Sequence, residues 1–586
     1  MVAADALPVV DSRLELVRAA MRTAGVDVFV VRATDGWLNE YVPDDHSTRR
    51  WLTGFTGSMG DAVVTATELH IVVDGRYTLQ ASQEVPAATV TTASTGQSIE
   101  GAWLELLGRI ARGKVVGIES ARTSLALMRT AGAAATKDGW TLQALAKSPV
   151  DVVRAEHDPP PALTGTMWAI DPALAGRSVE DRLAAGREVL QAHDLAGLAI
   201  SALDELAWVA NLRGDQFAYQ ATFRGRGLVV ADALVLSTDK SAFVGERPAE
   251  TAIRFVDDAG LAAALPKGAR IGVDPNTTPH ALAQALIDNG AVLVEVASPY
   301  AVLRTKKTAA ELAHMQAAFK RADAVVDDVQ KWLAQQLKKN RPVTELDVAT
   351  ETERRFRESG AFGLSFKVIS AAGMNGAVIH YSTPSAERLV KTGELFLLDT
   401  GAYYEGGYAT DLTRTFLAGP SQTKASKEQK RLYTLVLKAA IAGMSARVPV
   451  GVTGEQLDAI VRDPLWRHGL DYGHGTGHGV GVNVHEAPPS VRIGARGTIE
   501  PGQVFSIEPG VYLPGWGGVR IENLCTIVED TVEPPKGVPR RFLRVKPLTF
   551  SPLDNRLIDR ALLNDHEKRF LAWFKRGSRT QLPPTC

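Results

Sequence analysis

Apolar residues recur with a helical period in two long stretches of the C-terminal half of the chain. Residues 309–338 carry one continuous apolar stripe, and residues 425–445 repeat the pattern. A spacing of three to four residues places such side chains on one face of a helix. We therefore predict two long helices, each packed against a sheet. The first stripe consists of Leu312, Met315, Phe319, Ala322, Val326 and Val329.

Short apolar runs separated by turn residues predict β-hairpins beside these helices. Residues 395–398 are apolar, residues 405–407 read Glu-Gly-Gly, and residues 410–416 are again typical of a strand. A three-residue loop with glycine in the left-handed region would connect them. In that hairpin Asp399 and Asp411, 12 residues apart, would face each other.

A second hairpin is predicted further along the chain. Glu508 and Glu522 flank a stretch that contains Pro509-Gly510 and the glycines of residues 515–518. Arg520 precedes Glu522 by two residues, so both side chains would point to the same face of a strand. An arginine beside a ligand carboxylate would fix its orientation.

The pattern before residue 306 is typical of α/β domains. Residues 115–132 and 270–290 share one layout, a short apolar strand followed by an acid, a polar turn and a helix. Residues 148–163 are polar and rich in proline, which favours a linker. We therefore expect two related α/β domains and a larger catalytic domain. The expected ranges are 1–155, 156–305 and 306–586.

Composition narrows the class of protein. The 586 residues are too many for one core, and the formal net charge of −1 argues against nucleic-acid or membrane-surface partners attracted by bulk charge. Two cysteines exclude a disulfide framework. The first residues contain acids and no apolar run, and no apolar stretch reaches 18 residues. We expect a cytoplasmic protein.

Five residues form the candidate chemistry. Four carboxylates and one imidazole make an oxygen-rich ligand set that suits hard or borderline divalent cations. Four negative charges would balance two such ions, and a two-metal site can polarise a carbonyl and generate hydroxide. One acid near a turn is usually a turn residue or a solvated charge. Five together favour a metal site: Asp399, Asp411, His478, Glu508 and Glu522.

The ordered set of ligands resembles that of the pita-bread metallopeptidases, which include methionine aminopeptidase, prolidase and aminopeptidase P. Nearly the whole chain is most similar to the three-domain cytosolic form of aminopeptidase P, an Xaa-Pro aminopeptidase. The strings that carry the resemblance are RRWLTGFTGSMGDAVVT (49–65), VVDGRYTLQA (72–81), ALDELAWVANLRG (202–214), NGAVIHYSTP (375–384), TDLTRTF (410–416), LDYGHGTGHGVG (470–481), NVHEAP (483–488), GVRIENL (518–524) and LTFSPLDNRLID (548–559).

The resemblance implies a fold and an activity. It implies two creatinase-like α/β domains followed by a pita-bread catalytic domain with a C-terminal extension. It also implies release of the N-terminal residue from peptides with proline second, by a hydroxide activated by two metal ions. Manganese and a homodimer are expected on the same ground. One departure is the spacing of Asp399 and Asp411, which is one residue longer than is usual in the family.

Further site residues follow from the resemblance. His380, His474 and His485 would contact substrate and handle protons, because neutral imidazole can donate or accept near neutral pH. Glu508 would also take the proton of the attacking water.

Three more residues are candidates for binding substrate. Arg76 would reach a bound peptide, although an ion pair with Asp74 explains it equally well. Arg520 and Tyr512 would line the site, and core packing is an equal alternative for Tyr512.

Several alternatives remain open at this stage. A prolidase that cuts only Xaa-Pro dipeptides is the nearest, but prolidases generally have one N-terminal domain. Methionine aminopeptidases lack both N-terminal domains. A non-catalytic pita-bread protein that binds peptides or proteins would lose metal ligands, and creatinase-like hydrolases lack this metal set. All five ligands are present in this chain.

Overall fold

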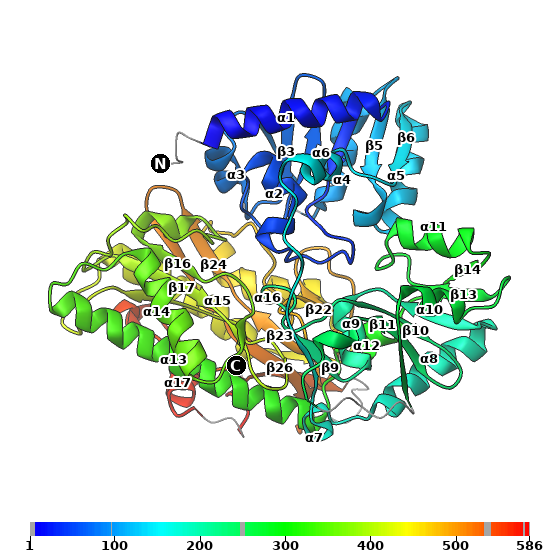
Figure 1. Cartoon of the computed structure of the whole chain (residues 1–586). Helices are drawn as coiled ribbons and strands as arrows, with labels where there is room; N and C mark the ends of the chain where they lie inside the picture. Colours follow the sequence, from blue (N-terminus) through cyan, green and yellow to red (C-terminus); the bar gives the residue numbers. More distant parts are fainter. Residues whose placement is uncertain (1–5, 95, 246–251, 533–540, 578–580, 585–586) are drawn as a thin grey trace. The chain divides into compact units, whose positions relative to one another are not determined.

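The computed structural model describes residues 6–94, 96–245, 252–532, 541–577 and 581–584 (Figure 1). It divides into two compact units. The N-terminal unit comprises residues 1–169, 177–218 and 222–301, and the C-terminal unit comprises residues 170–176, 219–221 and 302–586. Among the described residues, no helix combines the length and the apolarity that crossing a membrane requires.

The N-terminal unit begins with a mixed sheet of strand order β4-β3-β2-β1-β5-β6. Strand β2 runs antiparallel to its neighbours β1 and β3, and the pairs β3–β4, β1–β5 and β5–β6 are parallel. Helices α1 and α6 cover one face of this sheet, and α4 and α5 cover the other. The bounds are α1 Ala6–Thr23, β1 Val28–Val31, α2 Thr48–Thr53, β2 Asp61–Val64, β3 Leu69–Val73, α3 Thr78–Glu84, β4 Thr89–Thr92, α4 Ile99–Ile110, β5 Val115–Glu119, α5 Leu125–Asp138, β6 Thr141–Leu145 and α6 Pro149–His157.

A second sheet of the same unit repeats this topology. Its order β12-β11-β10-β8-β13-β14 has the same parallel and antiparallel pairs as the first sheet. Strands β5 and β13 occupy equivalent places, so the predicted repeat between residues 115–132 and 270–290 is confirmed. The bounds are β7 Met167–Ala169, α8 Val179–His193, β8 Gly197–Ile200, α9 Leu203–Val209, β9 Leu212–Gly214, β10 Gly225–Val229, β11 Leu234–Thr238, β12 Ile253–Val256, α10 Asp258–Ala263, β13 Arg270–Val273, α11 His280–Asp288, β14 Val292–Glu295 and α12 Pro299–Leu303.

The linker predicted at residues 148–163 is wrong in its first half. Residues 149–157 form helix α6, which Ser148 caps by accepting a hydrogen bond from the Val150 amide. Proline is tolerated in a first helical turn, because its missing N–H would have no partner there. Val150 and Val153 are buried in the core. The predicted domain boundaries at 155/156 and 305/306 stay predictions.

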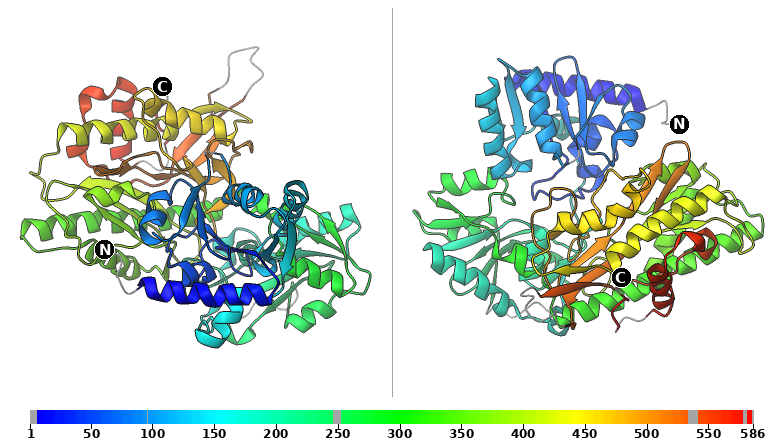
Figure 2. Two further views of the ribbon diagram at one scale, coloured as in Figure 1. Left: turned by 90° about the horizontal axis from the view of Figure 1, so that it is seen from above. Right: turned by 180° about the vertical axis from the view of Figure 1, so that it is seen from behind.

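Both predicted long helices are present in the C-terminal unit. Helix α13 (Ala309–Lys338) begins at a capping box of Thr308 and Glu311, and α15 spans Lys427–Met444. Helices α13 and α14 share a core with strands β16, β17 and β19. Figure 2 (right) shows α15 and α16 lying across the orange strands β23 and β26. The other helices are α7 Pro172–Ala175, α14 Glu345–Glu358, α16 Gly454–Trp466 and α17 Asp565–Lys575.

The strands of this unit form two main sheets, of order β16-β17-β19 and β20-β27-β26-β23-β21-β22. Two shorter pairs, β15-β18 and β24-β25, complete the pattern. The bounds are β15 Gly363–Leu364, β16 Ile369–Ala372, β17 Leu395–Thr400, β18 Ala402–Tyr403, β19 Leu412–Leu417, β20 Arg447–Pro449, β21 Gly477–Gly479, β22 Glu486–Val491, β23 Val504–Ile507, β24 Gly510–Leu513, β25 Gly517–Arg520, β26 Asn523–Glu529 and β27 Phe542–Pro547.

The first predicted hairpin exists, but its loop is longer than predicted. Strands β17 and β19 pair with Asp399 opposite Thr413, and one register continues to a bridge between Tyr403 and Ala409. Asp411 therefore lies two positions from a direct pairing with Asp399, on the same face of the hairpin. The same register holds at the Thr400–Leu412 pair and at the Tyr403–Ala409 bridge, so a loop of residues 404–408 joins the two strands.

The second hairpin brings its two glutamates directly opposite each other. Ile507 pairs with Asn523, and Gly510 pairs with Arg520. The same register places Glu508 opposite Glu522 in the short interruption between these pairs. The carboxylates of the two residues thus meet where the backbone ladder is open.

Residues after β27 hold the two hairpins together. The buried guanidinium of Arg414 donates to the carbonyl oxygens of Ser551 and Glu522. Asp323 of α13 accepts hydrogen bonds from the amides of Phe550 and Ser551. Arg414 therefore joins β19 to the backbone of Glu522, and Ser551 links Arg414 to α13.

Close backbone approach at Gly401 yields a stability prediction. A β-carbon on Gly401 would collide with the Thr410 carbonyl oxygen, whereas one on Gly363 would meet no atom within 4 Å. Gly401→Ala should lower stability by about 1–3 kcal/mol, typical of overpacking, and Gly363→Ala should change it much less. Thermal unfolding of both variants checks this, and equal apparent Tm values would contradict it.

Candidate metal centre

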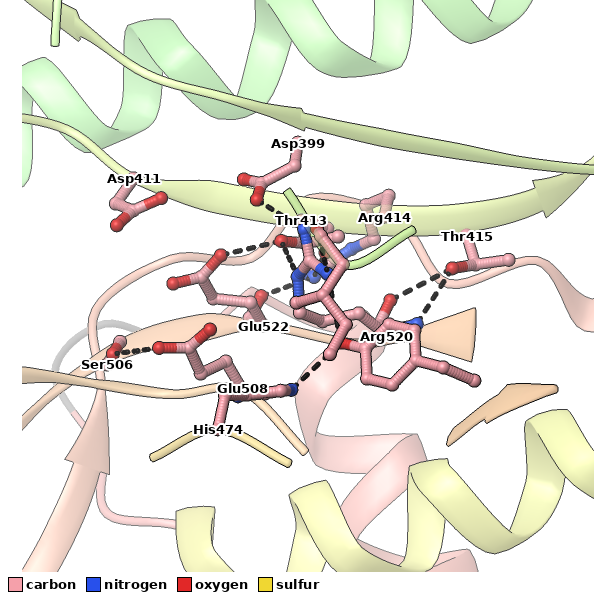
Figure 3. A network of polar contacts seen from close by, with 12 residues as sticks. Asp399, Asp411, Thr413, Arg414, Thr415, His474, Ser506, Glu508, Arg520 and Glu522 are labelled. Carbon is pink, nitrogen blue, oxygen red and sulfur yellow. Dashed lines mark hydrogen bonds and ion pairs between the residues drawn. The ribbon is translucent and has the colours of Figure 1, made fainter. Parts of the chain in front are cut away.

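Five side chains from the C-terminal unit lie within strands or next to strand ends, and Figure 3 shows the four carboxylates among them. Asp399 lies near the end of β17 and Asp411 directly precedes β19. Glu508 follows β23 and Glu522 directly precedes β26, while His478 lies within β21. All five residues that the sequence predicts as ligands therefore fall in one unit.

The side-chain nitrogen and oxygen atoms lie close enough together to surround a cation. His478 Nε2 lies 3.5 Å from Asp411 Oδ2 and 3.5 Å from Glu508 Oε1. Ligand atoms of Asp411, His478 and Glu522 all lie within 4.8 Å of one another. These separations are too long for hydrogen bonds between all the groups. They match ligand atoms that surround metal ions at metal–ligand distances of about 2.0–2.2 Å.

Burial and repulsion strongly disfavour ionised carboxylates here. Burial raises the pKa of Asp411 well above its usual value, and the charges of Glu522, Asp399 and Glu508 raise it further. The pKa of Glu522 is likewise raised well above its usual value, by burial and then by Glu508 and Asp399. Divalent cations would relieve both effects, because each supplies the charge that the pocket lacks.

Two buried carboxylate oxygens support the same conclusion. Asp399 Oδ1 and Glu522 Oε1 are buried and have no hydrogen-bond partner within the described residues. Each of these residues uses its other oxygen, since Asp399 Oδ2 contacts Arg520 and Glu522 Oε2 accepts from Thr413. A buried polar atom without a partner is costly, and coordination to a metal ion would satisfy it. The residues present therefore fit divalent cations.

The ring of His478 is oriented for the same role. Its Nδ1 lies 3.1 Å from the Gly479 carbonyl oxygen. A carbonyl only accepts, so Nδ1 carries a proton, and the neutral ring would present the lone pair of Nε2 toward Asp411 and Glu508. A metal-binding histidine is commonly fixed in this way by a hydrogen bond from its other nitrogen.

Arg520 connects the carboxylates to His474 (Figure 3). Its guanidinium is buried and pairs with Asp399 at 2.5 Å, not with Glu522 as the sequence spacing suggested. It also donates to the Tyr512 hydroxyl at 2.9 Å, and that hydroxyl lies 2.9 Å from His474 Nε2. Burial raises the pKa of Tyr512 to about 12, so its hydroxyl keeps a proton at neutral pH.

Two further histidines predicted from the sequence lie beside this centre. The ring of His485 packs edge-on against His478, with centroids 4.4 Å apart. His380 is half-buried and follows Ile379, whose carbonyl oxygen accepts a hydrogen bond from Arg520 at 3.2 Å. Both histidines are therefore adjacent to residues of the candidate centre.

Arg76 belongs to the N-terminal unit. Its guanidinium forms two hydrogen bonds with the Asp74 carboxylate, at 3.0 and 2.8 Å. The ion pair that the sequence offered as an alternative is thus present, and a substrate contact by Arg76 stays a prediction.

Two hydroxyl residues that the sequence analysis did not single out also orient the carboxylates. Thr413 donates to Glu522 at 2.7 Å, and Ser506 donates to Glu508 at 3.2 Å. Thr413 follows Asp411 by two residues, and Ser506 precedes Glu508 by two residues. In a strand this spacing keeps side chains on one face, so the sequence contained a signal for Ser506 beside Glu508. The contact of Thr413 with Glu522 joins distant segments and has no such signal.

Models of three protein families match the chain in sequence order. Residues 13–143 and 158–311 each match the creatinase/prolidase N-terminal domain, and residues 313–529 match metallopeptidase family M24. A solved structure supports the fold alone: prolidase from Pyrococcus furiosus, 23% identical, has a TM-score of 0.51 and covers 62% of this chain and 98% of its own.

Relatives of full length are more informative. The proteins named Xaa-Pro aminopeptidase P of Sordaria macrospora and Pyricularia oryzae are 34% and 35% identical, each over 95% of this chain and 94% of their own length. X-prolyl aminopeptidase from Caenorhabditis elegans, described as a cytosolic enzyme with a di-nuclear active site, is 26% identical with a TM-score of 0.87 over 97% of this chain and 95% of its own. The chain therefore belongs to the Xaa-Pro aminopeptidase P family, with two creatinase-type domains ahead of an M24 metallopeptidase domain.

Proposed function

We propose that this protein is a metal-dependent aminopeptidase that releases the N-terminal residue from peptides with proline in the second position. The observation that carries the proposal is the proximity of Asp411, His478, Glu508 and Glu522. One buried oxygen each of Asp399 and Glu522 has no hydrogen-bond partner within the described residues. The full-length relatives named Xaa-Pro aminopeptidase P support the substrate class.

The peptide bond before proline explains why such a site is needed. That bond is a tertiary amide without an N–H, and proline also restricts the residue before it. A peptidase that recognises an extended backbone through this N–H loses its contact. A site that holds the free amino terminus and the scissile carbonyl does not depend on it.

Two divalent metal ions are the proposed cofactors, and manganese is the proposed metal. The five ligands would hold them, and the di-nuclear site of the Caenorhabditis elegans enzyme supports the number. When bound, such ions polarise the scissile carbonyl and lower the pKa of a bound water. Carboxylate oxygens with one imidazole suit manganese, although zinc and cobalt accept similar ligands.

The remaining residues would bind substrate and move protons. The Glu508 carboxylate would accept a proton from the attacking water. His380, His474 and His485 would contact the peptide and exchange protons with it near neutral pH. Arg520 and Tyr512 would support His474 through the hydrogen bonds already described.

Arg76 would contact a bound peptide, and Arg520 and Tyr512 would line its site. Proline-containing peptides are the only partners proposed besides a second copy of the chain in a homodimer. A cytoplasmic location is supported by the description of the Caenorhabditis elegans relative as a cytosolic enzyme.

A dipeptidase of the prolidase type is the second candidate within the same chemistry. The Pyrococcus furiosus prolidase covers only 62% of this chain, so the remainder of this chain has no counterpart there. A non-catalytic peptide-binding protein is disfavoured because the complete ligand set is present.

The buried carboxylates predict how the metal-free protein responds to pH. A carboxyl whose pKa is raised on folding favours the folded state at low pH, and this stability is lost as the pH rises above about 4. Asp411→Asn removes one such group. In metal-stripped protein at pH 7.5 it should raise the apparent Tm by about 2 °C or more, and it should reduce the gain in Tm on adding Mn²⁺.

Asp463→Asn is the control for this measurement, because the Asp463 side chain is half-exposed and lies outside the ligand set. It should leave both Tm values nearly unchanged. A lower Tm of the metal-stripped Asp411→Asn protein at pH 7.5 would show that the carboxylates do not repel each other as described.

The two adjacent histidines should separate in their effects on metal. His478→Ala removes a ligand and should lower metal content after Mn²⁺ loading. His485→Ala should keep the metal and reduce kcat by ~10²-fold, typical of a lost proton-handling group. Elemental analysis and steady-state kinetics check this, and the reverse pattern would mean that the ligand is His485.

Substrate selectivity is tested with matched tripeptides. Ala-Pro-Ala should be cleaved after its first residue, and Ala-Ala-Ala should be cleaved slowly or not at all. Comparison with an Xaa-Pro dipeptide separates the two candidates, because a prolidase would cleave the dipeptide and leave Ala-Pro-Ala intact. Equal rates on both tripeptides would exclude the proposed specificity.

A further inference from the structure

A buried carboxylate outside the metal centre holds the loop that carries His380. Glu345, the first residue of α14, has an exposed fraction of 0%. Its carboxylate oxygens accept hydrogen bonds from four groups of residues 372–385. The donors are the Ala372 amide at 2.7 Å, Asn375 Nδ2 at 2.9 Å, the Tyr381 hydroxyl at 2.8 Å and the Ser385 amide at 3.2 Å.

The four donors are all neutral groups, and all of them point to the two oxygens of one carboxylate. Burying a carboxylate is costly unless hydrogen bonds replace its water. Hydrogen bonds to an ionised acceptor are roughly twice as strong as those between neutral groups. The loop therefore has one favourable arrangement around Glu345, in which all four donors converge on the same two oxygens.

The same loop lies against the candidate metal centre. Arg520, which pairs with Asp399, donates to the Ile379 carbonyl oxygen at 3.2 Å. The backbones of Gly376 and Gly518 are so close that a β-carbon on Gly518 would collide with the Gly376 carbonyl. Tyr381 packs with Tyr512 on the apolar cluster of Ile369, Ala371 and Leu397.

His380 is thus fixed through both of its neighbours. Ile379 is held by Arg520 from the side of the metal centre, and Tyr381 is held by Glu345 from the side of α14. We propose that Glu345 is a positioning residue that sets the place of the His380 imidazole in the site. This inference rests on the proposed function, because it assumes that His380 contributes to turnover.

Glu345→Gln tests the inference with little change in shape. One oxygen becomes an NH₂ group that cannot accept, so part of the donor set loses its acceptor and the loop can shift. A misplacement of about 1 Å in a catalytic group can cost ~10²-fold in rate. We expect Glu345→Gln to lower kcat about tenfold or more in the Mn²⁺-loaded full-length protein, with unchanged metal content.

A double-mutant cycle distinguishes positioning from a general structural effect. His380→Ala should lower kcat by ~10²-fold. If Glu345 acts through His380, adding Glu345→Gln to His380→Ala should lower kcat by less than about twofold more, because residues that act as a unit are not additive. Rates on Ala-Pro-Ala and metal content are measured for the two single variants and the double variant.

Asp347→Asn is the matched control. Asp347 lies in the same first turn of α14 and accepts hydrogen bonds from the Thr344 amide and hydroxyl as half of the capping box. Its loss should lower the Tm through the helix end and leave kcat unchanged. A fall in kcat with Asp347→Asn as large as that with Glu345→Gln would attribute the effect to α14 stability and overturn the inference.

The remaining outcomes separate this inference from the proposed function. A His380→Ala protein with wild-type kcat would contradict the role of His380, and the inference would fall with it. A slow His380→Ala protein combined with wild-type kcat for Glu345→Gln, or with fully additive losses, would overturn the inference alone. Should Glu345→Gln fail to fold, Tyr381→Phe removes a single donor and should lower kcat only in the presence of His380.

Discussion

Mutual repulsion among buried carboxylates is the constraint on which this catalytic unit depends. Asp399, Asp411 and Glu522 are almost entirely buried, and Glu508 lies beside them. Arg520 pairs with only one of the four, and burial and neighbouring charges raise the pKa of Asp411 and Glu522. Such a cluster destabilises the metal-free protein, and the same repulsion between carboxylates gives the site a strong affinity for divalent cations.

The four carboxylates are held close together because each lies at or next to the end of a strand. Asp399 and Asp411 lie on one face of the β17–β19 hairpin, and Glu508 and Glu522 lie opposite each other where the β23–β26 ladder opens. Arg414 joins the two hairpins through the Glu522 carbonyl and the segment after β27. The side chains are therefore held by rigid strands, as a preorganised site requires.

Much of this organisation could be predicted from the sequence, because the relevant signals are local. The apolar stripe at 309–338 predicts α13 with its bounds, and the Gly-bounded acidic strings predict the hairpins and all five members of the cluster. The repeat of two α/β layouts is confirmed by the matching strand orders of the two N-terminal sheets.

What the sequence could not give depends on contacts between distant segments. The sequence spacing places Arg520 beside Glu522, two residues away, but its ion-pair partner is Asp399 from another hairpin. The three-residue loop at 405–407 was wrong because the ladder ends at Tyr403 and Ala409. The linker prediction at 148–163 is wrong in its first half, because Ser148 and Pro149 begin a helix whose valines reach the core. Glu345 carries no local motif, since its donors come from residues 372–385.

The most direct test of the central claim is a diffraction measurement on Mn²⁺-soaked crystals at the manganese absorption edge. The account predicts two anomalous peaks, both within bonding distance of oxygens or nitrogens of Asp399, Asp411, His478, Glu508 and Glu522. Peaks at other side chains, or no peak among these five in fully loaded crystals, would contradict it.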